Sequence, residues 1–245
     1  MGFDTRWVVR CGPQSGYGMG LVDNSGNNVI AVFPGANAGL NAQIVRDAID
    51  QCRPHMLYAQ LEISPDVVLA AFMAARQQGI RTVINPSPWQ PLSAELLTLT
   101  QVMIVNTLEA AALFGYSRDS LPNCPADWLH ALPSLAAQIR WSGDWLIITL
   151  GDQGCVALGL EELLYQAAWN IEAIDPTGAG DAFNAGLLWG LERQTPQQAL
   201  CTANACGAYV AARNGVLPHL PDHQTLQTFM TSQAQPEERK IKRAF

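Results

Sequence analysis

The sequence has almost no lysine: its only two lysines, Lys240 and Lys242, lie in the C-terminal tail. The body of the chain therefore cannot supply the lysine of a P-loop, the strand lysine of a protein kinase, or a Schiff-base lysine for pyridoxal phosphate or an aldolase. This single absence excludes several large classes of enzyme.

Long apolar runs and paired cysteine motifs are also missing. No run of 18 apolar residues is present, so no transmembrane helix is indicated, and the N-terminus "MGFDTRWVVRCG" lacks the apolar stretch of a secretory signal. The six cysteines form no Cys-x-x-Cys pair, which predicts free thiols in a reducing cytoplasm and no metal framework. Cys201 and Cys206 could form a redox pair, but two small core residues of one helix are the favoured interpretation.

Charge is scarce and mostly negative. Charged residues make up 14% of the chain and the net charge is −7, which argues against a nucleic-acid partner. The only dense basic run, "RKIKR" at 239–243, is predicted to be a frayed, solvated tail. Apolar residues make up 49% of the 245, enough to fill the core of one large α/β domain or two small ones.

The apolar pattern alternates between strands and helices. A hairpin is predicted over 16–33, strands over 55–61, 81–85, 100–106 and 144–151, helices over 64–79 and 107–115, and a helix with a kink or break at Pro133. A further strand pair precedes residue 174. Such an order predicts an α/β fold, with a mostly parallel sheet covered by helices on both faces.

Polar residues follow the predicted strands, where ligands of parallel sheets bind. They are Glu62, Asn85, Asn106 with Glu109, Thr149 with Gly151, and the segment 175–181.

The stretch "DPTGAGDAF" at 175–183 combines glycines with an acid at the start of a predicted helix. Helix N-termini attract anions, and glycines at 178 and 180 allow a phosphate to approach the backbone closely. Asp181 lies in the first turn, where it could take a proton from an attacking hydroxyl while the backbone holds a transferring phosphoryl group. The alternative is a plain strand-to-helix turn in which Asp181 helps to cap the helix.

This stretch, with "NAGLLWGL" after it, resembles the C-terminal signature of the ribokinase-like (PfkB) carbohydrate kinases. The segments "PGANAGL" (34–40), "QLE" (60–62), "NPSP" (85–88), "NTLE" (106–109) and "TLGDQG" (149–154) follow the order and approximate spacing of that family. The resemblance covers residues 2 to about 230. It implies a ribokinase-like three-layer fold over residues 1–245, with a small lid hairpin inserted at 11–35.

The resemblance also implies roles for individual residues in an ATP-dependent phosphorylation of a sugar hydroxyl, that of ribose or a related pentose or nucleoside. Asp181 would be the general base and substrate contact, with an anion hole at Gly178, Ala179 and Gly180, and Glu62 would contact the sugar. Nucleotide contacts would come from Asn106, Thr149, Gly151, Asp152 and Asn204. Glu109 would hold Mg²⁺ through water, and a K⁺ ion would lie near Asp175, Thr177, Val210, Arg213 and Gly215.

Several of these residues have structural alternatives. Glu62 could be a surface acid at a strand end, and Asn85 is more simply a turn former. Glu109 could be a first-turn helix acid, and Asn204 an amide that packs a helix. The histidines are scattered without ligand spacing and receive no role.

Family members normally begin with a further strand and a segment that carries an early sugar-binding Asp and a Gly-Gly-x-x-x-Asn stretch. The sequence contains neither, so the resemblance implies an N-terminally incomplete domain. Two interpretations follow: an active cytoplasmic kinase, or a catalytically impaired remnant that binds nucleotide or a partner. A homodimer through the lid hairpin is also expected.

Overall fold

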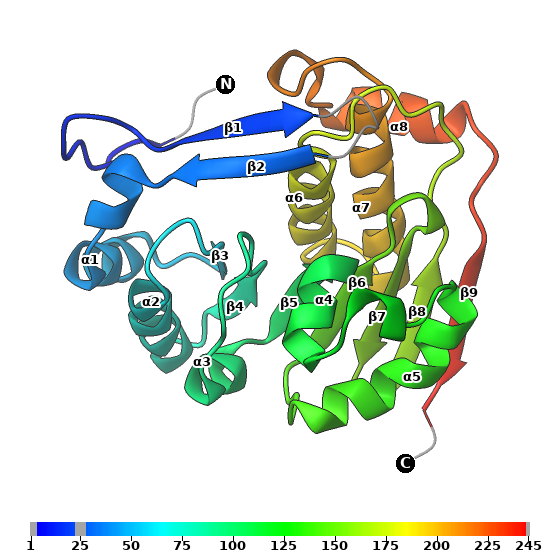
Figure 1. Cartoon of the computed structure of the whole chain (residues 1–245), viewed down its shortest axis with the longest axis horizontal. Coiled ribbons are helices and arrows are strands. Elements are labelled where there is room, and N and C mark those ends of the chain that lie inside the picture. Colours follow the sequence, from blue (N-terminus) through cyan, green and yellow to red (C-terminus); the bar gives the residue numbers. More distant parts are fainter. Residues whose placement is uncertain (1–3, 23–27, 244–245) are drawn as a thin grey trace. The chain divides into compact units, whose positions relative to one another are not determined.

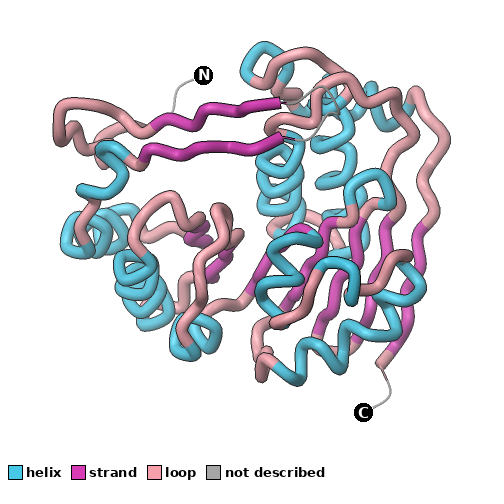
Figure 2. Tube along the Cα trace, in the orientation of Figure 1, coloured by secondary structure: helices cyan, strands magenta, loops and turns pink. Residues whose placement is uncertain are grey.

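A computed structural model describes residues 4–22 and 28–243 (Figure 1). The chain divides into two compact units, residues 1–101 and 102–245, and each is described separately. Helices and strands alternate within both units, as Figure 2 shows, which confirms the predicted α/β class.

The first unit begins with a hairpin of two antiparallel strands, β1 (Tyr17–Val22) and β2 (Asn28–Phe33). The predicted hairpin is thus confirmed, although its connection at 23–27 lies outside the described residues. At its base, the rings of Tyr17 and Phe33 lie 5.3 Å apart on directly paired positions. The short 3₁₀ helix η1 (Gly35–Gly39) follows.

The rest of the first unit is a parallel strand pair with helices. Its elements are α1 (Ala42–Cys52), β3 (Met56–Ala59), α2 (Pro65–Gln77), β4 (Arg81–Ile84) and α3 (Ala94–Leu99), and β3 pairs with β4 in parallel. Helix α2 begins as predicted because Ser64 caps it and Pro65 occupies its first position, where no N–H is needed. It buries Val68 and Phe72 completely.

The second unit has a five-stranded array with helices. Its elements are β5 (Val102–Asn106), α4 (Thr107–Phe114), η2 (Arg118–Ser120), α5 (Pro125–Gln138), β6 (Trp145–Thr149), η3 (Gly151–Gln153), β7 (Cys155–Gly159), β8 (Glu162–Gln166), α6 (Ala179–Leu191), α7 (Pro196–Ala211), η4 (Leu217–His219), α8 (His223–Thr231) and β9 (Glu238–Lys242). Strands β5 and β6 are parallel, while β6, β7, β8 and β9 pair antiparallel in sequence order. Helix α5 continues through Pro133, so of the predicted kink or break, the break is not found.

Helices α6 and α7 lie side by side in close contact (Figure 1). A Cβ at Gly186 would lie 2.7 Å from the Cys206 Sγ, and a Cβ at Gly190 would lie 2.8 Å from the Ala199 Cα. Glycine is therefore required at these positions for the two backbones to approach so closely. The small residues allow α6 and α7 to pack closely along this part of α6.

The prediction of a frayed tail at 239–243 is wrong for residues 239–242. These residues lie in β9, which pairs along the whole of β8, and Lys240 forms an ion pair with Glu162. Arg243 donates from Nη1 to the Gly159 carbonyl at 3.0 Å. The basic side chains remain exposed, as expected of a solvated segment, whereas the backbone is paired with β8.

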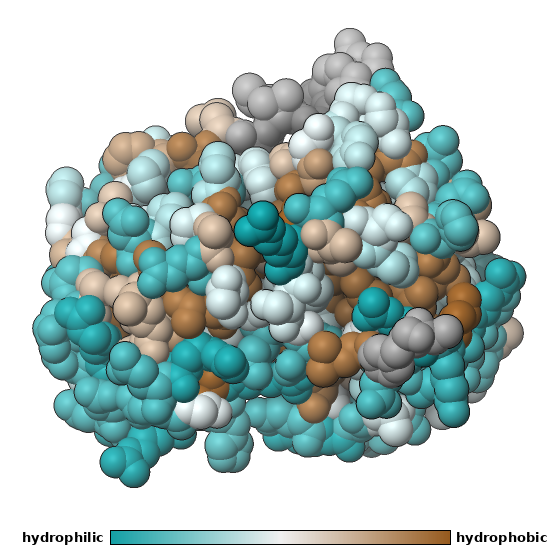
Figure 3. Space-filling view, turned by 90° about the horizontal axis from the view of Figure 1, so that it is seen from below, coloured by the Kyte–Doolittle hydropathy of each residue, from teal (hydrophilic) through white to brown (hydrophobic). Residues whose placement is uncertain are grey.

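All six cysteines are free, which agrees with the interpretation of Cys201 and Cys206 as core residues of one helix. Burial raises the pKa of both thiols to about 11. No helix of the described residues is long and apolar enough to span a membrane. On the face shown in Figure 3, hydrophobic residues are scattered among hydrophilic ones.

Candidate active site

One edge of the second unit's sheet carries a row of the predicted residues. Asn106 at the end of β5 pairs with Thr149 at the end of β6, Thr149 pairs with Cys155, and Cys155 pairs with Gln166. Because β6 and β8 both run antiparallel to β7, their carboxyl ends lie at this same edge. Neighbouring strands lie about 4.8 Å apart, so the row from Asn106 to Gln166 is about 14 Å long.

Asn106 and Glu109 form a reciprocal capping box at the start of α4. The Asn106 Oδ1 accepts hydrogen bonds from the Leu108 and Glu109 backbone N–H groups at 2.9 Å, and the Glu109 Oε2 accepts from the Asn106 N–H at 2.9 Å. Glu109 is buried, with 6% of its surface exposed. The spacing that suggested a magnesium site therefore also has a structural explanation.

The loop after β6 turns sharply at the same edge. Gly151 has φ +62° and Gly154 has φ +91°, and the Leu150 N–H donates to the Gly154 carbonyl at 2.7 Å. A Cβ at Gly154 would lie 2.1 Å from the Gln166 carbonyl oxygen, so only glycine fits against the end of β8. Asp152 is exposed on this loop, beside half-buried Thr149.

Asn204 connects α7 to the end of β8. Its Nδ2 donates to the Gln166 and Ala167 carbonyls at 3.1 and 3.2 Å, and it lies 3.6 Å from the Cys155 Sγ. Burial raises the pKa of the Cys155 thiol to about 12. These contacts match the packing alternative for Asn204, and its predicted nucleotide contact stays a prediction. The residue nevertheless lies at the same sheet edge as Thr149.

Helix α6 begins at Ala179, where the sequence pattern predicts it. Its N-cap, Gly178, is in the left-handed region at φ +75°, and having no side chain it provides no capping oxygen. A Cβ at Gly180 would meet no atom within 4 Å. Asp181 is exposed in the first turn. The first N–H groups of a helix have no partner within the helix, so this terminus is suited to an anion.

The turn before α6 is held by the carboxylate of Asp175. Its Oδ1 accepts from the Thr177 N–H at 3.0 Å and its Oδ2 from the Gly215 N–H at 3.4 Å. Hydrogen bonds from the Thr177 side chain and backbone, together with that from Gly215, hold the pKa of Asp175 below its usual value of 3.8. Three residues of the predicted potassium loops are therefore in contact.

The other two residues of those loops lie at the end of α7. The Val210 carbonyl accepts from the Arg213 N–H at 3.0 Å. The Arg213 guanidinium donates to the Tyr209 carbonyl at 2.5 Å and stacks on the Tyr209 ring, 3.4 Å from its centre. The positive charge of Arg213 is thus directed onto its own helix.

In the first unit, the predicted segments "QLE" and "NPSP" lie together after β3 and β4. The Leu61 N–H donates to the Ser87 carbonyl at 2.9 Å, and the Gln60 Nε2 donates to the Asn85 Oδ1 at 3.3 Å. Asn85 is buried, whereas Glu62 is exposed. The segment that contains the predicted sugar contact Glu62 is therefore adjacent to the "NPSP" segment within this unit.

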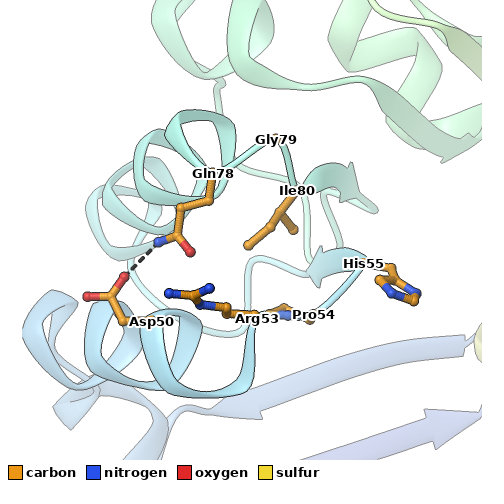
Figure 4. Close-up of a pocket in the computed structure, with 7 residues that line it drawn as sticks. All are labelled: Asp50, Arg53, Pro54, His55, Gln78, Gly79 and Ile80. Atoms are coloured by element: carbon orange, nitrogen blue, oxygen red, sulfur yellow. Dashed lines mark hydrogen bonds between the residues drawn. The ribbon is translucent and has the colours of Figure 1, made fainter.

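A pocket of about 660 Å³ lies at the opposite ends of β3 and β4 and contains none of the predicted residues (Figure 4). It is lined by Asp50, Arg53, Pro54, His55, Gln78, Gly79 and Ile80. Gln78 donates to Asp50 at 2.6 Å. Helices α1 and α2 both end here, so a cation such as Arg53 is favoured by their dipoles.

The arrangement is that of an α/β protein whose sheet edge lies in the same unit as a helix N-terminus suited to phosphate. The chain belongs to the pfkB family of carbohydrate kinases, whose model matches residues 3–223. This confirms the family inferred from the sequence motifs.

Three proteins illustrate the similarity. A ribokinase of Mus musculus is 33% identical over 173 residues, covering 69% of this chain and 51% of the mouse protein. A ribokinase of Staphylococcus aureus is 28% identical over 222 residues, covering 89% of this chain and 71% of that protein. The crystal structure of a ribokinase from Thermotoga maritima matches with a TM-score of 0.73 and 25% identity, over 88% of this chain and 69% of that one. The alignments thus span about half to two thirds or more of these relatives.

Proposed function

We propose that the chain transfers the terminal phosphoryl group of ATP to a hydroxyl of ribose or of a related pentose or nucleoside. The proposal is supported by membership of the carbohydrate-kinase family and by the similarity to proteins named ribokinase. The relatives are longer than the matched region, so the activity of this chain needs a direct test.

Gly180 is the observation that carries the proposal. It is the second residue of α6, has no neighbour that a Cβ would touch, and is not in a left-handed conformation. Alanine would stabilise a helix at such a position by up to about 1 kcal/mol. Neither packing nor backbone conformation therefore explains the glycine, whereas close approach of a phosphate to the backbone does.

Asp181 is positioned for proton transfer one residue further along. Its exposed carboxylate lies in the first turn of α6. As the hydroxyl oxygen bonds to phosphorus and the bond to ADP breaks, the hydroxyl proton passes to the carboxylate. The proposed anion hole at residues 178–181 holds the transferring group and stabilises its charge, with the Ala179 N–H shared with the Pro176 carbonyl, to which it donates at 3.1 Å.

The residues present fit a magnesium site that one protein carboxylate and the substrate phosphates form together. Among the described residues, no three His, Cys, Asp or Glu side chains cluster as a metal cage. Mg²⁺ is commonly held by one or two carboxylates plus substrate phosphates, and Glu109 would supply one such carboxylate through water. When bound, the ion neutralises phosphate charge.

The oxygens of the proposed potassium loops accept hydrogen bonds within the protein. Asp175 uses its two oxygens for Thr177 and Gly215, and the Val210 carbonyl accepts from Arg213. An ion here would have to share these oxygens.

Glu62 is the proposed sugar contact in the first unit, and the hairpin β1–β2 is the proposed lid and dimer surface. The hairpin exposes large apolar side chains, including Met19 at 54% and Tyr17 at 50%. Such exposed apolar surface favours association with a second copy. Sedimentation of the chain against a variant carrying Met19→Ser and Val32→Ser measures this; an unchanged dimer places the interface elsewhere.

The kinase proposal is tested by assaying phosphate transfer to a panel of sugars and nucleosides with Asp181→Asn. We expect a loss of 10² to 10⁴ in kcat. Asp66→Asn is the matched control, because Asp66 is also an exposed acid in the first turn of a helix. Equal rates for parent and Asp181→Asn would overturn the mechanism. If ATP raises the unfolding temperature but no sugar phosphate forms, the chain is a nucleotide-binding protein and not a kinase.

A further inference from the structure

Val216 occupies the space in which a side chain of Gly178 would lie. A Cβ built on Gly178 would be 2.7 Å from the Val216 Cγ1 and 2.8 Å from its Cγ2. Both methyl groups therefore press against the backbone of the N-cap of α6. No sequence motif indicates Val216, because Gly178 lies 38 residues away in the sequence and has no side chain that would suggest a contact.

Val216, called the wedge below, is held in place by the core. Val216 packs against a buried cluster that includes Ala182 of α6, Val210 of α7 and Leu226 of α8. Valine branches at Cβ and has few allowed rotamers, so its methyl groups form a rigid surface.

Hydrogen bonds tie the same two segments together on either side of the wedge. The Ile174 and Asp175 N–H groups donate to the Ala211 carbonyl at 2.8 and 3.1 Å, and the Gly215 N–H donates to Asp175. The turn before α6 and the segment after α7 thus form one connected structure.

A glycine at the N-cap creates a need for such support. Glycine adopts left-handed and right-handed conformations about equally well, so the φ of +75° at Gly178 is not imposed by the residue itself. The direction of the first N–H groups of α6 follows from this angle. The turn itself favours this angle, because the Ala179 N–H donates to the Pro176 carbonyl at 3.1 Å, and Val216 adds a contact from outside the turn.

We propose that Val216 is a positioning residue for phosphoryl transfer: its methyl groups help to hold Gly178 in the conformation that directs the Gly180 N–H, at the start of α6, toward the transferring phosphate. The inference rests on the proposed function for its effect on rate, but the effect on the turn is independent of it. Misplacement of a reacting group by about 1 Å can cost a hundredfold in rate.

The competing explanation is that Val216 is only part of the core. Leu226→Ala provides the matched control. Leu226 is 8% exposed in the same cluster, and its truncation removes more apolar volume than Val216→Ala does. Val216→Thr is the conservative variant, since threonine keeps two branches at Cβ. Val216→Ala removes both methyl groups from Gly178.

The first measurement is hydrogen exchange of the backbone amides in residues 174–182, well below the unfolding temperature. We expect Val216→Ala to speed exchange there at least tenfold, while Val216→Thr and Leu226→Ala change it less than threefold. The second measurement is steady-state phosphoryl transfer. We expect Val216→Ala to lower kcat ten- to a hundredfold with KM for ATP within twofold, and Val216→Thr to restore most of the rate.

The outcomes separate the two proposals. Unchanged exchange in Val216→Ala, or an equal change in Leu226→Ala, overturns the positioning role whatever the activity. Faster exchange with an unchanged kcat overturns its catalytic part. Faster exchange in a chain whose parent form transfers no phosphate supports the wedge and contradicts the proposed function.

Discussion

Asn106 and Glu109 satisfy each other's backbone at the start of α4, with the two reciprocal hydrogen bonds both 2.9 Å long. Glu109 is also the residue proposed to hold magnesium through water. Deleting its side chain would remove a helix cap and a metal ligand together, so a simple alanine variant cannot distinguish them.

Glu109→Gln separates the two roles. Glutamine serves in a capping box as well as glutamate does, and the chain itself uses Gln198 in this way with Thr195 at the start of α7. We expect an unfolding temperature within about 2 °C of the parent. Loss of the carboxylate should raise the magnesium concentration for half-maximal rate about tenfold or more, as measured by titrating magnesium at fixed ATP.

Glu109→Ala is the companion variant, and it should lose about 1 kcal/mol of unfolding free energy because the cap is gone. If Glu109→Gln titrates with magnesium as the parent does, Glu109 is a cap alone.

Gly180→Ala is predicted to stabilise the protein while impairing transfer. A Cβ at this position meets no protein atom within 4 Å, so the helix should gain up to about 1 kcal/mol. The same methyl group would stand in the space of the phosphate, so KM for ATP should rise or kcat should fall about tenfold or more. Thermal unfolding measures the expected gain in stability, and steady-state rates measure the expected loss of activity.

Gly186→Ala is the matched control in the same helix, because its Cβ would lie 2.7 Å from the Cys206 Sγ. It should lower the unfolding temperature. A Gly180→Ala variant with full activity would show that no ligand approaches the backbone there.

Much of the fold follows from the sequence because the strands are continuous apolar runs. β5 and β6 were predicted within two residues at each end, and α6 begins where the glycine-to-apolar transition places it. Helix α1 was not predicted, although Asn41 caps it and its apolar residues lie on one face; only Ile49 among them is buried. β9 was not predicted because its charged residues are typical of a solvated tail, and only its pairing with β8 makes it a strand.

The candidate site was predictable where local spacing carries it and not where contacts are distant. The turn at 175–181 and the pair Asn106 and Glu109 can each be predicted from a short stretch of sequence, because their residues lie within a few positions of one another. The contact of Gly178 with Val216 depends on how α7 packs against α6, which no local pattern encodes. The same packing decides that Asn204 bonds to the end of β8.

The carboxylate of Asp175 predicts a pH dependence. Its pKa is held below 3.8, first by the Thr177 side chain, then by the Thr177 and Gly215 backbone N–H groups. A carboxyl group whose pKa is lower in the folded state stabilises that state above its unfolded pKa, and this contribution disappears as the pH falls through the folded value. Asp175→Asn should therefore be less stable than the parent at pH 7, and the difference should shrink below about pH 3.8.

Urea unfolding midpoints at pH 7, 5, 4 and 3 measure the difference between parent and Asp175→Asn. Asp222→Asn is the comparison, because hydrogen bonds from Thr225 also lower the pKa of Asp222, which caps α8. Both variants should show the same narrowing at low pH, since both lose a charged acceptor of backbone N–H groups. Only Asp175→Asn should also slow phosphoryl transfer at pH 7, because only Asp175 joins the turn before α6 to the Gly215 segment. A stability difference that stays constant down to pH 3 would mean that the charge of Asp175 does not hold this turn.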